Sequence, residues 1–139
     1  MKETEFLSEM DKYGFQNVGK ILCKADHLAF NLTRRCAEHG CVYLWIENSG
    51  QVFTVVYVGK AGRTLHARCQ QHKGGFRRSS TGKAHAGRLR KGFIDNKCYD
   101  VYARKADNAT LFGEDAVSMA CVEERVFIKK FQPTWNAAW

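Results

Sequence analysis

Residues 41–60 read CVYLWIENSGQVFTVVYVGK, and this stretch decides the fold. Residues 41–47 and 51–58 are both rich in β-branched and aromatic side chains, which favour strands. Between them, Asn48-Ser49-Gly50 supplies residue types that are common in tight turns. The pattern therefore predicts a β-hairpin.

The residues before this hairpin predict a helix and a second strand pair. We expect a short polar helix over 3–13, followed by strands over 18–24 and 28–33 with a turn at Ala25-Asp26-His27. Residues 33–40 are charged and predict a short helix or a loop.

Helices dominate the chain after the hairpin. Thr64 is placed to cap a helix that ends near His72, and Gly74-Gly75 predicts a break after it. The further elements are expected as a basic loop over 76–82, a helix over 84–91, a strand over 97–104, a loop over 107–115 and a helix over 117–131. In the last helix, the apolar spacing predicts core positions at Met119, Val122, Val126 and Phe127.

This order of elements predicts an α+β fold. We expect a small central three-stranded antiparallel or mixed sheet flanked by helices, with a strand-containing extension at the N-terminus. A chain of 139 residues suits one compact domain. We therefore expect a single domain over 1–139, with the extension at 1–39 and the core at 40–137.

The positive charge of the chain is concentrated in one window. The formal net charge is +8, but residues 60–91 contain ten basic residues and no acidic ones, which leaves −2 elsewhere. Such a window predicts an anionic partner, which from charge alone is nucleic acid, a membrane surface or an acidic protein.

Other features of the composition point to a protein of the cytoplasm without a membrane partner. The longest apolar run, at residues 41–46, is far shorter than the ~20 residues that a bilayer needs. The first residues, MKETEF, carry acids where a signal peptide needs bases. The six cysteines form no CxxC pair, so we expect reduced thiols rather than zinc ligands or disulfides.

Five residues are candidates for chemistry, although each has an ordinary structural explanation by itself. Tyr43 and Tyr57 lie on the two predicted hairpin strands, where tyrosines commonly just pack. Arg68 and His72 are four residues apart, so they share a helix face that could bind a phosphate or simply face solvent. Glu124 offers a hard oxygen ligand for Mg²⁺ or Mn²⁺, or a surface ion pair.

Together these residues resemble the GIY-YIG nuclease family. Cys41-Val42-Tyr43 corresponds to the first signature triplet, with cysteine in place of its first glycine, and Tyr57-Val58-Gly59 corresponds to the second. Arg68 and His72 follow at the family's spacing. The family's E-x-x-x-I pattern with a later proline and asparagine is matched by Glu124, Ile128, Pro133 and Asn136. The spacing to Ile128 favours Glu124 over Glu123, and the resemblance covers about residues 40–137.

The resemblance implies a metal-dependent DNA endonuclease with one Mg²⁺ or Mn²⁺ at Glu124. Arg68 would hold the phosphate oxygens, and either Tyr43 or Tyr57 would take a proton from water, helped by His72 or Lys60. The residues expected along the nucleic-acid track are Arg63, Lys73, Arg77, Arg78, Lys83, Arg88, Arg90, Lys91 and Asn136.

Two other functions remain open at this point. The same scaffold could bind nucleic acid without cutting it, or the chain could be a basic interaction domain that matches the motifs by chance. The resemblance does not decide between DNA and RNA. Because little of the chain lies outside the core, we expect an enzyme that is structure-selective, or weakly specific, or dependent on a homodimer or a protein partner for target choice.

Overall fold

The computed structural model describes residues 1–33 and 39–136. The elements are α1 (Glu3–Lys12), β1 (Gln16–Lys24), β2 (His27–Leu32), β3 (Cys41–Ser49), β4 (Val52–Ala61), α2 (Leu65–Arg78), α3 (Ser80–Ile94), β5 (Cys98–Lys105), β6 (Asn108–Leu111), β7 (Glu114–Ser118) and α4 (Ala120–Phe131). The mixture of helices and strands confirms the predicted α+β class. The expected helix or loop at 33–40 falls largely outside the described residues.

The main sheet has five strands in the order β2-β1-β5-β3-β4, and all of its neighbouring pairs are antiparallel. The three predicted core strands, β5, β3 and β4, lie side by side within it. The predicted N-terminal pair does not stand apart from this sheet, because β1 pairs with the outer edge of β5. The sheet therefore has five strands rather than the expected three, because the strands of the N-terminal extension join the central three.

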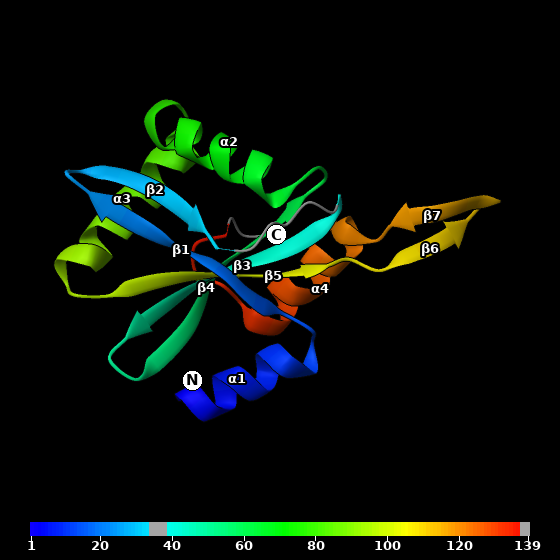
Figure 1. The fold of residues 1–139 in the computed structure, drawn as a ribbon, viewed down its shortest axis with the longest axis horizontal. Helices are drawn as coiled ribbons and strands as arrows, with labels where there is room; N and C mark the ends of the chain where they lie inside the picture. The colour runs from blue at the N-terminus through cyan, green and yellow to red at the C-terminus, as the bar shows by residue number, and fades with distance from the viewer. Residues whose placement is uncertain (34–38, 137–139) are drawn as a thin grey trace.

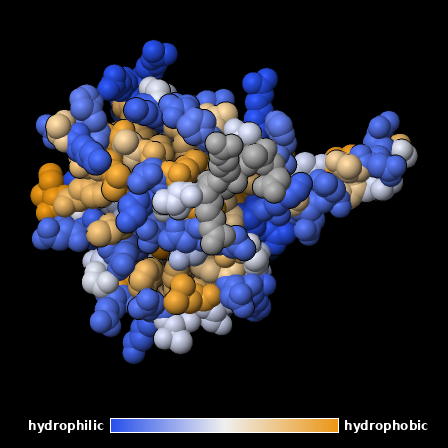
Figure 2. Space-filling model, in the orientation of Figure 1, coloured by the Kyte–Doolittle hydropathy of each residue, from blue (hydrophilic) through white to orange (hydrophobic). Residues whose placement is uncertain are grey.

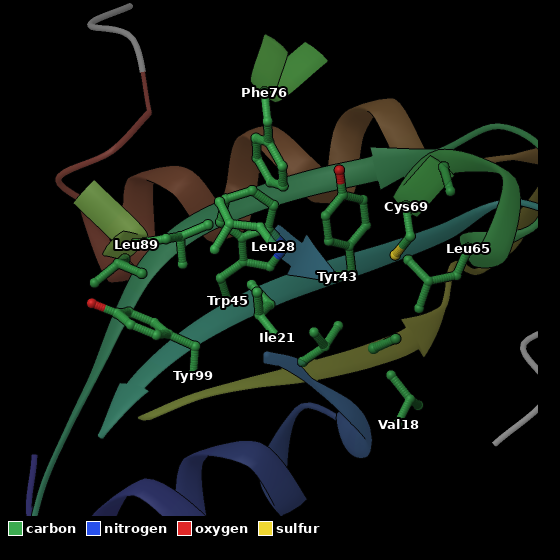
Figure 3. Close-up of a cluster of buried hydrophobic side chains, with 14 of the residues drawn as sticks. Val18, Ile21, Leu28, Tyr43, Trp45, Leu65, Cys69, Phe76, Leu89 and Tyr99 are labelled. Carbon is green, nitrogen blue, oxygen red and sulfur yellow. The ribbon is translucent and has the colours of Figure 1, made fainter. Parts of the chain in front are cut away.

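Helices cover both faces of this sheet (Figure 1). α2 and α3 lie on one face, where they bury Leu65, Phe76 and Leu89 against Tyr43 and Trp45 of β3 (Figure 3). α1 and α4 lie on the other face, and their buried residues include Phe6, Met10 and Phe127. Alternate residues of β3 enter the two cores, so this strand is buried on both faces, which explains its nearly continuous apolar sequence.

The prediction of a break at Gly74-Gly75 is wrong, because α2 continues through both glycines to Arg78. The chain turns instead at Ser79, whose hydroxyl accepts a hydrogen bond from the amide of Gly82 at 2.9 Å and caps α3. A Cβ on Gly82 would overlap the carbonyl group of Gly75. Gly82 therefore allows α3 to approach α2 closely, and the predicted loop over 76–82 does not exist.

The expectation of a loop over 107–115 is also wrong. The chain forms a two-stranded hairpin, β6–β7, which projects from the body of the protein (Figures 1 and 2). Phe112, in the turn between the two strands, is fully exposed. The predicted helix over 117–131 begins only at Ala120 for the same reason. Polar residues cover much of the surface in this view, and none of the described helices is long and apolar enough to cross a membrane.

The apolar positions of α4 were predicted only in part. Phe127 is buried as expected, but Val122 and Val126 are about half exposed. Ala120, Glu124 and Phe127 recur at intervals of four and three residues, so they lie on one face of the helix. This face is turned towards the sheet, where Ala120 and Phe127 are buried. Glu124 therefore lies on the inward face of α4.

Candidate active site

The pairing of β3 with β4 brings the two candidate tyrosines together. Tyr43 lies opposite Gly59, and Trp45 lies opposite Tyr57. Val56 is an extra residue in β4 with no partner in β3, so the strand bulges immediately before Tyr57. The rings of Tyr43 and Tyr57 lie on the same face of the sheet, with their centroids 6.1 Å apart.

Helix α2 places a histidine over this tyrosine pair. The Thr64 hydroxyl caps the helix by accepting from the Ala67 amide at 3.2 Å. Two turns later, Nε2 of His72 lies 2.5 Å from the hydroxyl oxygen of Tyr43. Both side chains are buried, and the His72 ring packs edge-on against Tyr57 at 5.5 Å.

Burial keeps this cluster uncharged. It raises the pKa of Tyr43 well above the ordinary value, and it raises the pKa of Tyr57, although the Arg68 guanidinium opposes both shifts. Burial and then the Arg68 charge lower the pKa of His72 to about 3. Tyr43, Tyr57 and His72 are therefore all neutral near pH 7.

The two cations of the site come from α2 and from the end of β4. Burial disfavours the charged form of Arg68, but interactions with Tyr43 and Tyr57 outweigh it and raise the pKa of the guanidinium. Nη1 of Arg68 also donates to Gln71 Oε1 at 3.0 Å. Lys60 is exposed, and its ammonium group donates to Cys121 Sγ at 2.8 Å, which raises the pKa of the lysine. Both residues are cationic near neutral pH.

The structure distinguishes the two neighbouring glutamates of α4. Glu123 pairs with Arg104 at 3.0 Å and also accepts a hydrogen bond from the Asp107 amide at 2.7 Å. Glu124 instead lies within electrostatic reach of Lys60, Arg68 and Arg125. Burial raises its pKa even though these cations lower it. A partly desolvated carboxylate that faces the site is the donor that a divalent cation requires.

The candidate metal site contains a single carboxylate. Among residues 1–33 and 39–136, no three side chains of the His, Cys, Asp or Glu type gather closely enough to hold an ion. Glu124 could therefore hold Mg²⁺ or Mn²⁺ only as one protein ligand, and phosphate oxygens and water would have to supply the others. This arrangement suits Mg²⁺, which usually keeps several waters.

Asn136 lies beside the site, but its amide group is engaged by the backbone of β4. Oδ1 accepts from the Val58 amide at 2.9 Å, and Nδ2 donates to the Val58 carbonyl at 2.8 Å. In this structure Asn136 thus supports the strand that carries Tyr57. A contact with nucleic acid remains a prediction for this residue.

The other residues of the predicted track are exposed on α2 and α3 and in the turn before α2: Arg63, Lys73, Arg77, Arg78, Lys83, Arg88, Arg90 and Lys91. A hollow of about 260 Å³ is lined by residues that include Arg63 and Arg68. A second hollow of about 380 Å³ lies along α2 and is lined by residues that include Lys73, Arg77 and Arg78. The track therefore contains two concave basic surfaces, one of them at Arg68.

Comparison with solved structures identifies the fold. Bacteriophage T4 EndoII, solved as a mutant, has a TM-score of 0.72 at 17% sequence identity, and the match covers 94% of this chain and 98% of the EndoII chain. The restriction endonuclease HPY188I, solved in complex with product DNA, has a TM-score of 0.53 at 20% identity, with 94% and 79% of the two chains covered. The chain shares the fold of these proteins. No protein-family model and no curated protein sequence matches it.

Sequence reasoning missed two residues of this cluster. His85 on α3 is buried, and its ring lies 5.0 Å from that of Tyr57. Trp135 packs near both Trp45 and His85. A single histidine in a short basic helix gave no signal of burial, because only the packing of α3 on the sheet places it there. The motif Tyr57-Val58-Gly59 identified Gly59 from the sequence, but the sequence did not show that Gly59 lies against the Tyr43 ring.

Proposed function

We propose that the protein is a GIY-YIG-type endonuclease that hydrolyses phosphodiester bonds in DNA with one Mg²⁺ or Mn²⁺. The observation that carries the proposal is the convergence of Tyr43, Tyr57, Arg68, His72 and Glu124, which come from β3, β4, α2 and α4. The shared fold with EndoII and with a restriction endonuclease that was solved with product DNA supports DNA as the substrate.

Arg68 is the group that binds the scissile phosphate. A planar guanidinium can donate hydrogen bonds to two non-bridging phosphate oxygens at once. The hollow beside Arg68 is open to a nucleic-acid strand that approaches along α2. Glu124 would hold the divalent cation, which supplies Lewis-acid stabilisation of the charge on the phosphate and the leaving oxygen. The carboxylate and the guanidinium thus act on the same phosphate from α4 and α2.

The tyrosines and His72 form a route for the proton of the attacking water. Tyr57 is the more exposed tyrosine, and its ring centroid lies 6.1 Å from that of Tyr43, whose hydroxyl meets His72. Tyr57 takes the proton from water while its own passes through Tyr43 to Nε2 of His72. Burial is the main cause of the low pKa of His72, and the Arg68 charge lowers it further, so a bound phosphate that compensates the Arg68 charge would make this histidine a better acceptor.

Nicking of supercoiled plasmid DNA in Mg²⁺ or Mn²⁺ tests the proposal. Wild type should nick, whereas Glu124→Gln and Arg68→Ala should lose at least about a hundredfold in rate. Glu123→Gln is the matched control, because it makes the same chemical change one residue away and should retain cleavage.

Fluorescence anisotropy with labelled DNA in EDTA reports binding separately from cleavage. Binding without cleavage under either metal would overturn the proposal in favour of a nucleic-acid-binding module. Neither binding nor cleavage would indicate a basic interaction domain. Parallel reactions with RNA measure the preference between the two nucleic acids.

A further inference from the structure

The chain after α4 forms hydrogen bonds to the outer edge of β4 on both sides of Tyr57. β4 is an edge strand of the sheet, so one side of its backbone has no neighbouring strand. The Trp135 amide donates to the Val56 carbonyl at 2.9 Å, and the Asn136 side chain makes two hydrogen bonds to the Val58 backbone. These three bonds bracket the tyrosine that faces the substrate.

His85 connects this segment to helix α3. Its Nε2 lies 3.1 Å from the Trp135 carbonyl oxygen, and a carbonyl can only accept, so Nε2 carries the proton. The same ring lies edge-on against Tyr57 at 5.0 Å and against Trp45 at 5.5 Å. His85 is 4% exposed, so neither DNA nor solvent can use it directly.

We infer that His85 is a positioning residue for Tyr57, holding its ring by direct packing and its strand through the Trp135 carbonyl. The effect on rate rests on the proposed function, whereas the effect on the Tyr57 ring does not. His85 is distinct from His72, which touches the Tyr43 hydroxyl on the other side of the cluster.

The two contacts of His85 can be removed separately. His85→Phe keeps a ring against Tyr57 but leaves the buried Trp135 carbonyl without its donor. His85→Gln keeps an amide N–H near the position of Nε2 but removes the ring. His85→Ala removes both contacts. His66→Gln is the control, because His66 is an exposed histidine on α2.

Single-turnover nicking measures the consequence for the reaction. His85→Phe and His85→Ala should lower the single-turnover rate constant about ten- to hundredfold with DNA binding within about twofold of wild type, because a misplaced base slows chemistry more than binding. His85→Gln should recover part of this loss. The loss caused by His85→Phe should disappear in a Tyr57→Phe background, whereas a general structural defect would persist there.

Labelling with 3-fluorotyrosine measures the ring itself without DNA. The ¹⁹F resonance of Tyr57, assigned with Tyr57→Phe, should shift or broaden in His85→Phe and His85→Ala, while that of Tyr13 should not change. An unchanged Tyr57 resonance would overturn the inference. If wild type does not cut DNA, the proposed function fails, and this spectrum still decides the role of His85.

One measurement on wild type covers the case in which the variants do not fold. The ¹⁵N-histidine spectrum at pH 7 should show His85 neutral with its proton on Nε2. A proton on Nδ1 alone would break the contact with Trp135 and would contradict the inference.

Discussion

The Tyr43 ring lies directly over the α-carbon of Gly59 on the neighbouring strand. A Cβ at residue 59 would fall 2.5 Å from the Tyr43 hydroxyl oxygen and 2.9 Å from the Tyr57 ring. Both distances are shorter than any ordinary contact of a Cβ atom. The glycine of the second signature triplet is therefore required by the packing of the two tyrosines, and the site cannot form in the same way with any larger residue there.

Gly59→Ala should consequently damage the fold and the site together. We expect a loss of about 1–3 kcal/mol in the free energy of unfolding, because the methyl group overpacks a buried strand pair. Urea unfolding measures this loss, and plasmid nicking should fall with it. Gly62→Ala, where a Cβ would meet no atom within 4 Å, should be nearly neutral. Equal behaviour of the two variants would contradict the packing argument.

Glu123 should prove to be a stabilising residue rather than a ligand. Its carboxylate is mostly buried, pairs with Arg104 and accepts from the Asp107 amide. Glu123→Gln should lower the free energy of unfolding by about 1–3 kcal/mol, because the half-buried Arg104 guanidinium loses the charge of one of its two carboxylate partners, Glu123, and keeps only Asp107. Lys129→Gln, at an exposed position of the same helix, serves as the control. Cleavage by Glu123→Gln below its melting temperature should stay close to wild type.

The stability of the protein should fall as the pH is lowered from about 7 to 5.5. Burial lowers the pKa of His72 to about 3 and also lowers the pKa of His85. In the unfolded chain both histidines bind protons near pH 6.5. The unfolded state therefore gains more protons than the folded state as the pH falls, which favours unfolding, by up to about 1.4 kcal/mol per pH unit for each histidine.

Urea unfolding at several pH values checks this slope. His72→Gln should reduce the dependence on pH whatever it does to the stability at pH 7. His27→Gln, at an exposed position of β2, is the control for a histidine-to-glutamine change outside the buried cluster. A wild-type protein with no loss of stability between pH 7 and 5.5 would show that the two histidines are not held neutral.

The basic track should govern the salt dependence of DNA binding. Changing Arg77, Arg78 and Lys83 to alanine should weaken binding and reduce the slope of log Kd against log salt by about 2–3, since each phosphate contact contributes about 0.9. The matched control replaces Lys2, Lys12 and Lys130, which removes the same charge from residues outside the track, before or within α1 and within α4. Anisotropy titrations in 50–200 mM salt compare the two triple variants. Equal slopes would place the DNA elsewhere.

The sequence by itself determined the elements whose signals are local. The central hairpin was predictable because β-forming residues flank a turn, and the shared face of Arg68 and His72 follows from helical spacing. The concentration of charge in residues 60–91 also needed no structure. The order of the family motifs then pointed to one site formed by Tyr43, Tyr57 and Glu124.

The tertiary structure decided every feature that depends on contact between distant segments. Gly74-Gly75 reads as a helix break, but the buried Phe76 and the close approach of α3 keep the helix intact. β1 joins the sheet because it pairs with the edge of β5 that β3 leaves free, and β5 lies far from β1 in the sequence. His85 became part of the cluster only because α3 packs on the sheet beside Trp135. Such pairings involve residues far apart in the chain, and local spacing holds no information about which distant partner will bury or pair a given residue.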